Sequence, residues 1–313
     1  MNDAVNMVEH SPELTAHTSA KKRRRKVNVA PYLMILPSLL FVLIFAYYPA
    51  VDGLVMSFFN WDGFNSPTFI GLHNFVAYLT SGHVGVEVFH LAVLTAGGMI
   101  VSLSMPLLAA ELLYNHRSRL GRLYKPLLVI PMVIPPIVTF EIWGNIFNPQ
   151  SGLLNDLLRT VGLSSLTNTW LANPVIAIYC LLFVGFPWVS NLYLLIYLAG
   201  LQNIPTDLYD AFALDGKSIW KRIQAIDIPM LMGQIRLVAI FSIIASIQHF
   251  VVILVLTQGG PGYATMVPGV DMYNSAFSYD EYGLGMAIGA LMFLAVLLLT
   301  LLTFRFRKKD GMA

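Results

Sequence analysis

Charged residues are scarce in this chain of 313 residues: Asp, Glu, Lys and Arg make up 12% of it, whereas apolar and aromatic residues make up 57%. Soluble domains usually carry about 25% charged residues. A deficit of this size, combined with long apolar runs, excludes an ordinary soluble domain. The composition instead predicts a polytopic helical membrane protein.

Cysteine is nearly absent as well, since Cys180 is the only one, and an intrachain disulfide is therefore excluded. The sequence lacks the G-x-x-x-x-G-K-[ST] pattern of a phosphate-binding loop and the H-E-x-x-H pattern of a zinc site, and its seven histidines are scattered. The neighbouring acids of "YDEY" (279–282) are typical of solvated surface. We expect no catalytic site, metal or cofactor in this chain.

Six apolar runs are each long enough to cross a hydrocarbon core about 30 Å thick. They cover residues 31–52, 88–113, 126–147, 173–200, 234–257 and 284–304. Several contain proline or glycine, which membrane helices tolerate where neighbouring helices satisfy the freed backbone groups. The predicted fold is all-α, with a six-helix transmembrane domain over 31–305 and tails over 1–30 and 306–313.

Basic residues predict the orientation of these runs. Of the nineteen Lys and Arg residues, eighteen fall in four groups. These groups lie before the first run, between the second and third runs, from the end of the fourth run to Arg236, and after the sixth run. Arg159 is the exception. Since positive residues favour the cytoplasmic side, both termini and residues 201–235 are predicted to be cytoplasmic. The cluster "KKRRRK" (21–26) would suit nucleic-acid binding in a soluble protein. Directly before a span it favours a membrane anchor, so no nucleic-acid partner is expected.

The cytoplasmic segment 203–229 contains the pattern of two short helices joined by a glycine turn. Leu208, Ala211 and Phe212 follow at i, i+3 and i+4, so they share one helix face. Gly216 comes where a helix needs a left-handed terminating residue.

A second short helix is predicted after Ser218, which is placed to cap it. Its isoleucines share one face, and Lys221 and Arg222 are predicted to point away from that face. Two interpretations of the whole segment remain open: a loop that packs only against its own bundle, or a docking surface.

The fifth run carries a polar stripe. Ser242, Ser246 and His249 follow at i, i+4 and i+7, with Gln248 beside them. Polar residues inside spans tend to face a cavity or one another. Serine hydroxyls alone would favour helix–helix packing. The addition of His249 and Gln248 favours a substrate path.

Family resemblance bears on segment 203–229. The segment resembles the cytoplasmic loop with which ABC-type, binding-protein-dependent permeases dock their ATPase subunits, whose pattern is acidic-Ala-Ala-x-x-Asp-Gly-Ala and then Ile-x-Leu-Pro. The matching residues are Asp210, Ala211, Asp215, Gly216, Ile226 and Pro229. Asp210 replaces the usual Glu, Phe212 a small residue and Lys217 the usual Ala. "FNWDGF", "FIGLHNF", "GLLN" and "LTQGGPGYAT" resemble the carbohydrate branch, in particular the maltose-type and glycerol-phosphate-type first permease subunit.

The resemblance implies a permease subunit of the bacterial cytoplasmic membrane that moves a sugar or oligosaccharide by alternating access. Its implied partners are a second permease subunit, two ATPase subunits that bind ATP and Mg, and an extracytoplasmic solute-binding protein. The implied ATPase-coupling residues are Leu208, Asp210, Ala211, Phe212, Asp215 and Gly216. Alternatives are an importer of a phosphorylated polyol or another small solute, a membrane enzyme, or a self-sufficient channel.

The resemblance also implies a substrate path. In the maltose-type family the fifth span offers hydroxyl and amide groups to the sugar, at positions matched by Ser242, Ser246 and His249. Trp188, Asn191 and Tyr193 of the fourth run are further candidates, either as sugar contacts or as residues of an interfacial aromatic belt. For Glu141 of the third run, a bond within the bundle and a place at the outer mouth both remain open.

Overall fold

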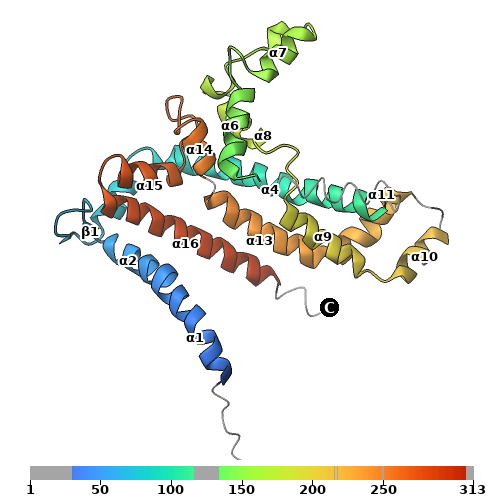
Figure 1. Ribbon diagram of the computed structural model, residues 1–313, viewed down its shortest axis with the longest axis horizontal. Coiled ribbons are helices and arrows are strands. Elements are labelled where there is room, and N and C mark those ends of the chain that lie inside the picture. Colours follow the sequence, from blue (N-terminus) through green and yellow to red (C-terminus); the bar gives the residue numbers. More distant parts are fainter. Residues whose placement is uncertain (1–29, 116–133, 215, 217, 249, 308–313) are drawn as a thin grey trace, which may run out of the picture. The chain divides into compact units, whose positions relative to one another are not determined.

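The computed structural model describes residues 30–115, 134–214, 216, 218–248 and 250–307. The chain divides into two units, one up to Pro49 and the other from Ala50 onward. The first unit contains α1 (Ala30–Val42), the π-helix η1 (Leu43–Tyr47) and the first two residues of α2 (Tyr48–Met56) (Figure 1). The side chains of residues 31–49 are all exposed and mostly apolar. A helix that is apolar all round and buries nothing within its own chain needs lipid or a partner to cover it.

The second unit consists of helices and one short ribbon in the part of the chain that the structure describes. The ribbon pairs β1 (Phe59–Asn60) with β2 (Thr68–Phe69) in antiparallel register. The helices up to the fourth predicted run are α3 (His73–Leu79), α4 (Val84–Asn115), α6 (Pro136–Ile146), α7 (Leu153–Thr160), η3 (Ser164–Leu166), η4 (Trp170–Ala172), α8 (Ala177–Phe183) and α9 (Asn191–Gln202). Those that follow are α10 (Thr206–Leu214), α11 (Ile219–Arg222), η5 (Ile223–Asp227), α12 (Ile228–Met230), α13 (Met232–Gln248), α14 (Val251–Leu256), α15 (Pro268–Phe277) and α16 (Tyr282–Arg307).

Helix α4 is a central element of the second unit. It packs against α13 and α9, and α16 packs against α15, α3 and α13 (Figure 1). One buried core cluster includes Tyr197, Leu201 and Leu231 from α9 and the start of the fifth span, and a second surrounds Ile253 and Val270. Since lipid tails are as apolar as these side chains, close van der Waals packing holds such helices together.

Four helices of the described residues are long and apolar enough to cross a membrane, and a fifth span results if one bent helix pair is counted. The four are Pro31–Met56, Val84–Asn115, Met232–Leu256 and Tyr282–Leu301, which confirms the first, second, fifth and sixth predicted runs. The third predicted run, 126–147, begins outside the described residues, which include only α6 from it. The count of six spans therefore stays a prediction.

The fourth predicted run, 173–200, is not one continuous helix. It is split into α8 and α9 by an irregular stretch, residues 184–190. Pro187 has no amide hydrogen to donate, and the backbone is left-handed at Gly185 (φ +89°) and at Trp188 (φ +56°). The bent pair is formed by η3–η4 and α8, which meet at 92°.

A local hydrogen-bond network around Asn155 organises residues 148–173. The Asn155 side chain is almost fully buried, at 1% exposed. Its amide donates to the carbonyl oxygens of Pro149 (3.0 Å) and Asn168 (2.9 Å). Its Oδ1 accepts from the Trp170 indole (2.8 Å) and the Asn168 amide (3.2 Å). Hydrogen bonds between polar groups of the segment itself therefore hold it in one conformation.

Replacing Gly200 with Ala tests the packing of α9 on the start of the fifth span. A methyl group there would overlap the side chains of Leu231 and Gln234. Overpacking of this kind typically costs about 1–3 kcal/mol, so we expect a lower melting temperature for the purified protein in detergent. Gly233→Ala is the matched control, because a methyl group at Gly233 meets nothing within 4 Å. Equal melting temperatures for the two variants would contradict the close contact.

Candidate functional site

A cavity of about 430 Å³ lies within the second unit. Helices α4, α6, α8, α9, α13 and α14 and the 184–190 stretch contribute to its walls. Its polar lining residues are Ser102, Thr139, Ser190, Tyr193, Ser242 and Ser246. Among the described residues that line it, none is Asp, Glu, Lys or Arg. The chemistry of its wall is therefore hydroxyl groups set among aliphatic and aromatic side chains.

Trp188 lies in the wall because of the break in the fourth run. Its indole nitrogen donates to the Leu182 carbonyl oxygen (2.9 Å), and its ring contacts those of Phe183 and Phe186, with centroids 5.4 and 4.8 Å away. These contacts fix the indole beside the cavity. Irregular backbone at membrane depth is tolerated where it lines a cavity, which matches the place of this stretch.

The polar stripe of α13 faces the cavity in part. Ser242 and Ser246 both line it, and Ser242 is 2% exposed. Across the cavity wall, a Cβ atom at Gly98 of α4 would lie 3.3 Å from the Ser246 hydroxyl. Ser246 therefore lies against the neighbouring helix and also lines the cavity. Its position is compatible with both predicted roles of the stripe, helix–helix packing and a substrate path.

The other predicted path residues fall elsewhere. Tyr193 is buried and lines the cavity, whereas Asn191 is buried in the first turn of α9 without lining it. Gln248 and Glu141 are exposed and do not line it. His249 lies outside the described residues.

Three hydroxyl residues of the cavity wall were not predicted. They are Ser102, Thr139 and Ser190. Ser102 follows the Gly97–Gly98 pair in the second run, and small and polar residues together in a span are a signal for a close helix contact. The other two gave no usable pattern, because which helix faces meet is not written in the sequence of one helix.

The segment predicted to dock a partner forms a second candidate surface. In α10, Leu208, Asp210 and Ala211 are exposed and Phe212 is partly buried. Gly216 has φ +62°, which confirms the predicted left-handed turn between the two short helices. Asp215 lies outside the described residues.

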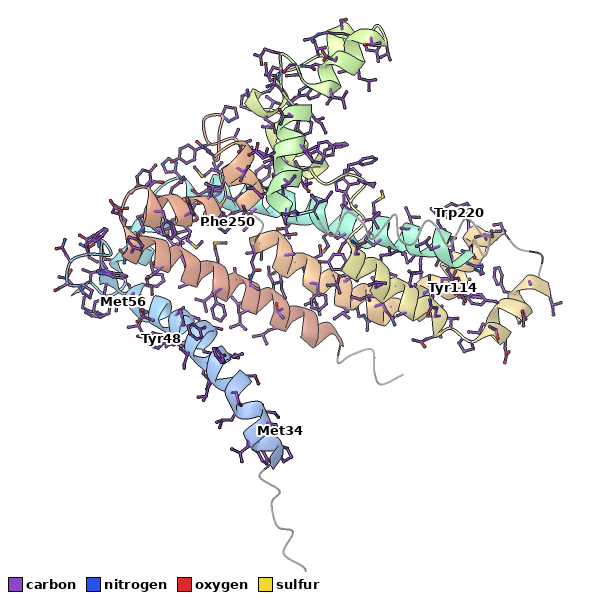
Figure 2. All side chains as sticks on the ribbon, viewed as in Figure 1. Met34, Tyr48, Met56, Tyr114, Trp220 and Phe250 are labelled. Carbon is purple, nitrogen blue, oxygen red and sulfur yellow. The ribbon has the colours of Figure 1, made fainter. Side chains whose placement is uncertain are left out.

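The helix that follows this turn begins where it was predicted. Ser218 precedes α11 with extended backbone, although its hydroxyl makes no capping hydrogen bond. Leu214 and Trp220 are 90% and 66% exposed, and Figure 2 shows Trp220 at the same end of the bundle as Tyr114. Large apolar side chains therefore lie open on both sides of the turn.

Arg222 is paired inside the bundle, which the sequence did not predict. Its Nη2 lies 3.3 Å from Glu111 Oε2, and its Nε lies 3.1 Å from Asp227 Oδ2. The Tyr209 hydroxyl donates to Asp227 Oδ1 (2.8 Å), and the guanidinium carbon lies 5.0 Å from the centre of the Tyr209 ring. These four residues, Glu111, Tyr209, Arg222 and Asp227, are called the Arg222 cluster below.

The Arg222 cluster is held away from solvent. Side-chain exposure is 17% for Arg222, 5% for Glu111 and 0% for Asp227. Burial, followed by the hydrogen bond to Asp227, raises the pKa of Tyr209 well above its ordinary value, so the hydroxyl keeps its proton and acts as donor. Removing one partner of a buried ion pair typically costs about 3–5 kcal/mol, because the other charge is left uncompensated.

Comparisons with known proteins agree with one another. The sequence profile of the family described as "Binding-protein-dependent transport system inner membrane component" matches residues 102–309. The probable ABC transporter permease protein YurN of Bacillus subtilis is 31% identical over 291 residues, which is 90% of this chain and 97% of that protein. The trehalose/maltose transport system permease protein MalF of Thermococcus litoralis is 31% identical over 287 residues, 90% of this chain and 95% of that protein.

A solved structure shares the fold. A chain of a bacterial alginate ABC transporter, crystallised in complex with its alginate pentasaccharide-bound periplasmic protein, has a TM-score of 0.79 at 20% identity, covering 91% of this chain and 96% of that one. The present chain therefore belongs to the family of binding-protein-dependent transport system inner membrane components. It is a multi-pass membrane permease component of an ABC transporter and not an enzyme.

The cavity predicts a water-accessible position at Ser246. The only cysteine, Cys180, is buried and does not line the cavity, so it serves as an internal control. In a Cys180→Ser background, we expect Ser246→Cys to react with a small charged thiosulfonate reagent while Cys180 of the native chain stays unmodified over the same time. Mass spectrometry of the intact protein measures the labelling. A Ser246→Cys variant as inert as Cys180 would assign Ser246 to helix packing alone.

Proposed function

We propose that this chain is one of two membrane subunits of an ATP-driven importer that carries a neutral sugar or oligosaccharide across the bacterial cytoplasmic membrane. The observation that carries the proposal is the uncharged cavity with its hydroxyl and aromatic wall, in a chain of this family. A relative of similar length, the arabinooligosaccharides transport system permease protein AraP of Bacillus subtilis, is 29% identical over 281 residues. The names of AraP and MalF support a sugar as the cargo.

The wall offers the two kinds of contact that a sugar needs. The hydroxyl of Ser246 is placed to exchange hydrogen bonds with sugar hydroxyls, and the indole of Trp188 presents a flat apolar face. The volume of about 430 Å³ falls in the range of small-molecule sites, which is about 300–1,000 Å³. A phosphorylated polyol would need a basic group to compensate its charge, and none of the described lining residues is Lys or Arg.

The direction of transport and the energy source belong to the assembled complex. We place both termini and residues 203–229 on the cytoplasmic side, as the basic residues predict. There, two ATPase subunits that bind ATP and Mg dock on the exposed side chains of α10 and α11, including Leu208 and Trp220. A second permease subunit completes the passage, and an extracytoplasmic binding protein delivers the sugar. ATP-driven closure of the ATPase pair then switches the access of the cavity from one side to the other.

Purification and uptake test the proposal together. The tagged chain, co-expressed with the genes adjacent to its own, is expected to copurify with a second permease chain and an ATPase. In proteoliposomes with the binding protein added, we expect ATP-dependent uptake from a panel of maltose, trehalose and arabino-oligosaccharides. Recovery of this chain alone, with solute flux that needs no ATP, would indicate a channel instead. Uptake of glycerol phosphate but of no neutral sugar would contradict the proposed cargo.

Gly216 gives a test of the docking segment. A Cβ atom there meets nothing within 4 Å, so the only cost of a side chain is the left-handed backbone at φ +62°. For a β-branched residue that cost is about 1–2 kcal/mol, so we expect Gly216→Val to lower uptake per ATP hydrolysed by about tenfold. Gly216→Asn should keep most activity, because Asn tolerates this conformation.

The control for Gly216→Val is Gly162→Val. Gly162 also has a positive φ, +80°, with nothing within 4 Å of an added Cβ, but it follows α7, far along the chain from the docking segment. We expect Gly162→Val to keep the wild-type ratio of uptake to ATP hydrolysis. The same loss in both variants would show a general effect of backbone strain and would argue against a coupling role for the turn.

A further inference from the structure

Arg222 joins two carboxylates from different parts of the chain. Its guanidinium contacts Glu111 near the end of α4 and Asp227 at the end of η5, 3.3 and 3.1 Å away. A guanidinium is planar and donates in fixed directions. It therefore satisfies both carboxylates only over a narrow range of relative positions of α4 and α11. The ion pairs resist sliding of α11 along α4.

Tyr209 brings α10 into the same unit. It donates to Asp227 from the helix that carries Leu208, Asp210 and Ala211, and its ring lies against both the Arg222 guanidinium and the Tyr114 ring of α4. Three elements, α10, α11 and α4, therefore meet in one buried cluster. The cluster has one guanidinium and two carboxylates, so the loss of Arg222 leaves both carboxylates buried without a counter-charge, and the loss of Glu111 removes the ion pair that joins α4 to α11.

The other half of α4 forms a wall of the cavity. Gly98 lies opposite Ser246, and Leu91, Leu94 and Ser102 line the cavity. From Gly98 to Glu111 the helix rises about 20 Å. Because α4 continues as one helix of 32 residues, also past Pro106, we expect a displacement at Glu111 to reach the cavity wall. The closeness of Gly98 to Ser246 makes that wall sensitive to small shifts of α4 against α13.

We propose that the Arg222 cluster is the rigid link through which the α10–α11 segment moves α4 and thereby the cavity wall, with Arg222 and Glu111 as positioning residues for transport. The inference rests on the proposed function, since it needs an ATPase to act on α10 and α11. The proposed link names the residues, Arg222 and Glu111, through which a movement of the docking segment reaches the cavity wall. A cluster that only stabilised the fold would affect assembly and melting but not the ratio of ATP to sugar.

The experiment measures ATP hydrolysed per sugar taken up in proteoliposomes of the full complex, with whichever of maltose and trehalose the wild type transports. The variants are Glu111→Gln, Arg222→Gln, their double variant and Arg222→Lys. We expect each single Gln variant to raise the ratio at least about fivefold, with assembly retained, and the double variant to be no worse than either single one. Arg222→Lys keeps the positive charge but loses the planar guanidinium that contacts both carboxylates. The number of ATP molecules hydrolysed per sugar should therefore also rise in this variant.

Arg159→Gln is the matched control. Arg159 forms an exposed ion pair with Asp156 (2.9 Å) on α7, so its replacement removes the same charge and one ion pair without touching the cluster or the docking segment. Its ratio should remain that of the wild type. A wild-type ratio in Glu111→Gln and Arg222→Lys would overturn the link while the proposed function stands. Failure of both of these variants to assemble would also overturn the link, because the cluster would then be needed for folding and assembly of the complex. A wild-type complex without ATP-dependent uptake would contradict the proposed function, and the link would fall with it.

Discussion

The contact of α4 with its neighbours is the constraint on which the second unit depends. Near its middle, Gly98 allows the approach of Ser246 on α13, and at one end Glu111 binds Arg222. The first contact requires the absence of a side chain, and the second requires a buried charge with its partner in place. Both leave α4 little freedom to move alone. The cavity and the docking segment consequently contact two regions of the same helix, α4.

Much of the fold was predictable from apolar length. Four of the six predicted runs correspond to helices long and apolar enough to span, because a membrane span of this kind needs little besides length and low charge. The fourth run was expected to tolerate its proline, but the sequence did not indicate that the stretch with Gly185 and Pro187 would divide it into two helices. Prolines inside other runs do not break their helices, as Pro37 in α1 and Pro106 in α4 show. Whether a proline interrupts a span depends on its neighbours in space, and these are not visible in one sequence.

The candidate site was predicted only in part, for a similar reason. Gly216 was predictable because a helix that ends in a tight turn needs a left-handed residue, and that need is local. Ser242 and Ser246 were predictable as a stripe along one helix, but the close approach of Ser246 to Gly98 of α4 was not. The pairing of Arg222 was not predicted, because its partner Glu111 lies 111 residues earlier in the chain. Pairs so distant in sequence leave no local pattern.

The network around Asn155 has a consequence for biogenesis. Every partner of its side chain lies between Pro149 and Trp170, so the hydrogen bonds close within a single connection between two hydrophobic runs. A loop this short loses little entropy on closing. With the topology proposed above, this connection therefore satisfies its buried amides without contacts from later helices. Moving it back into lipid would place its other polar groups where no water is available to pair with them.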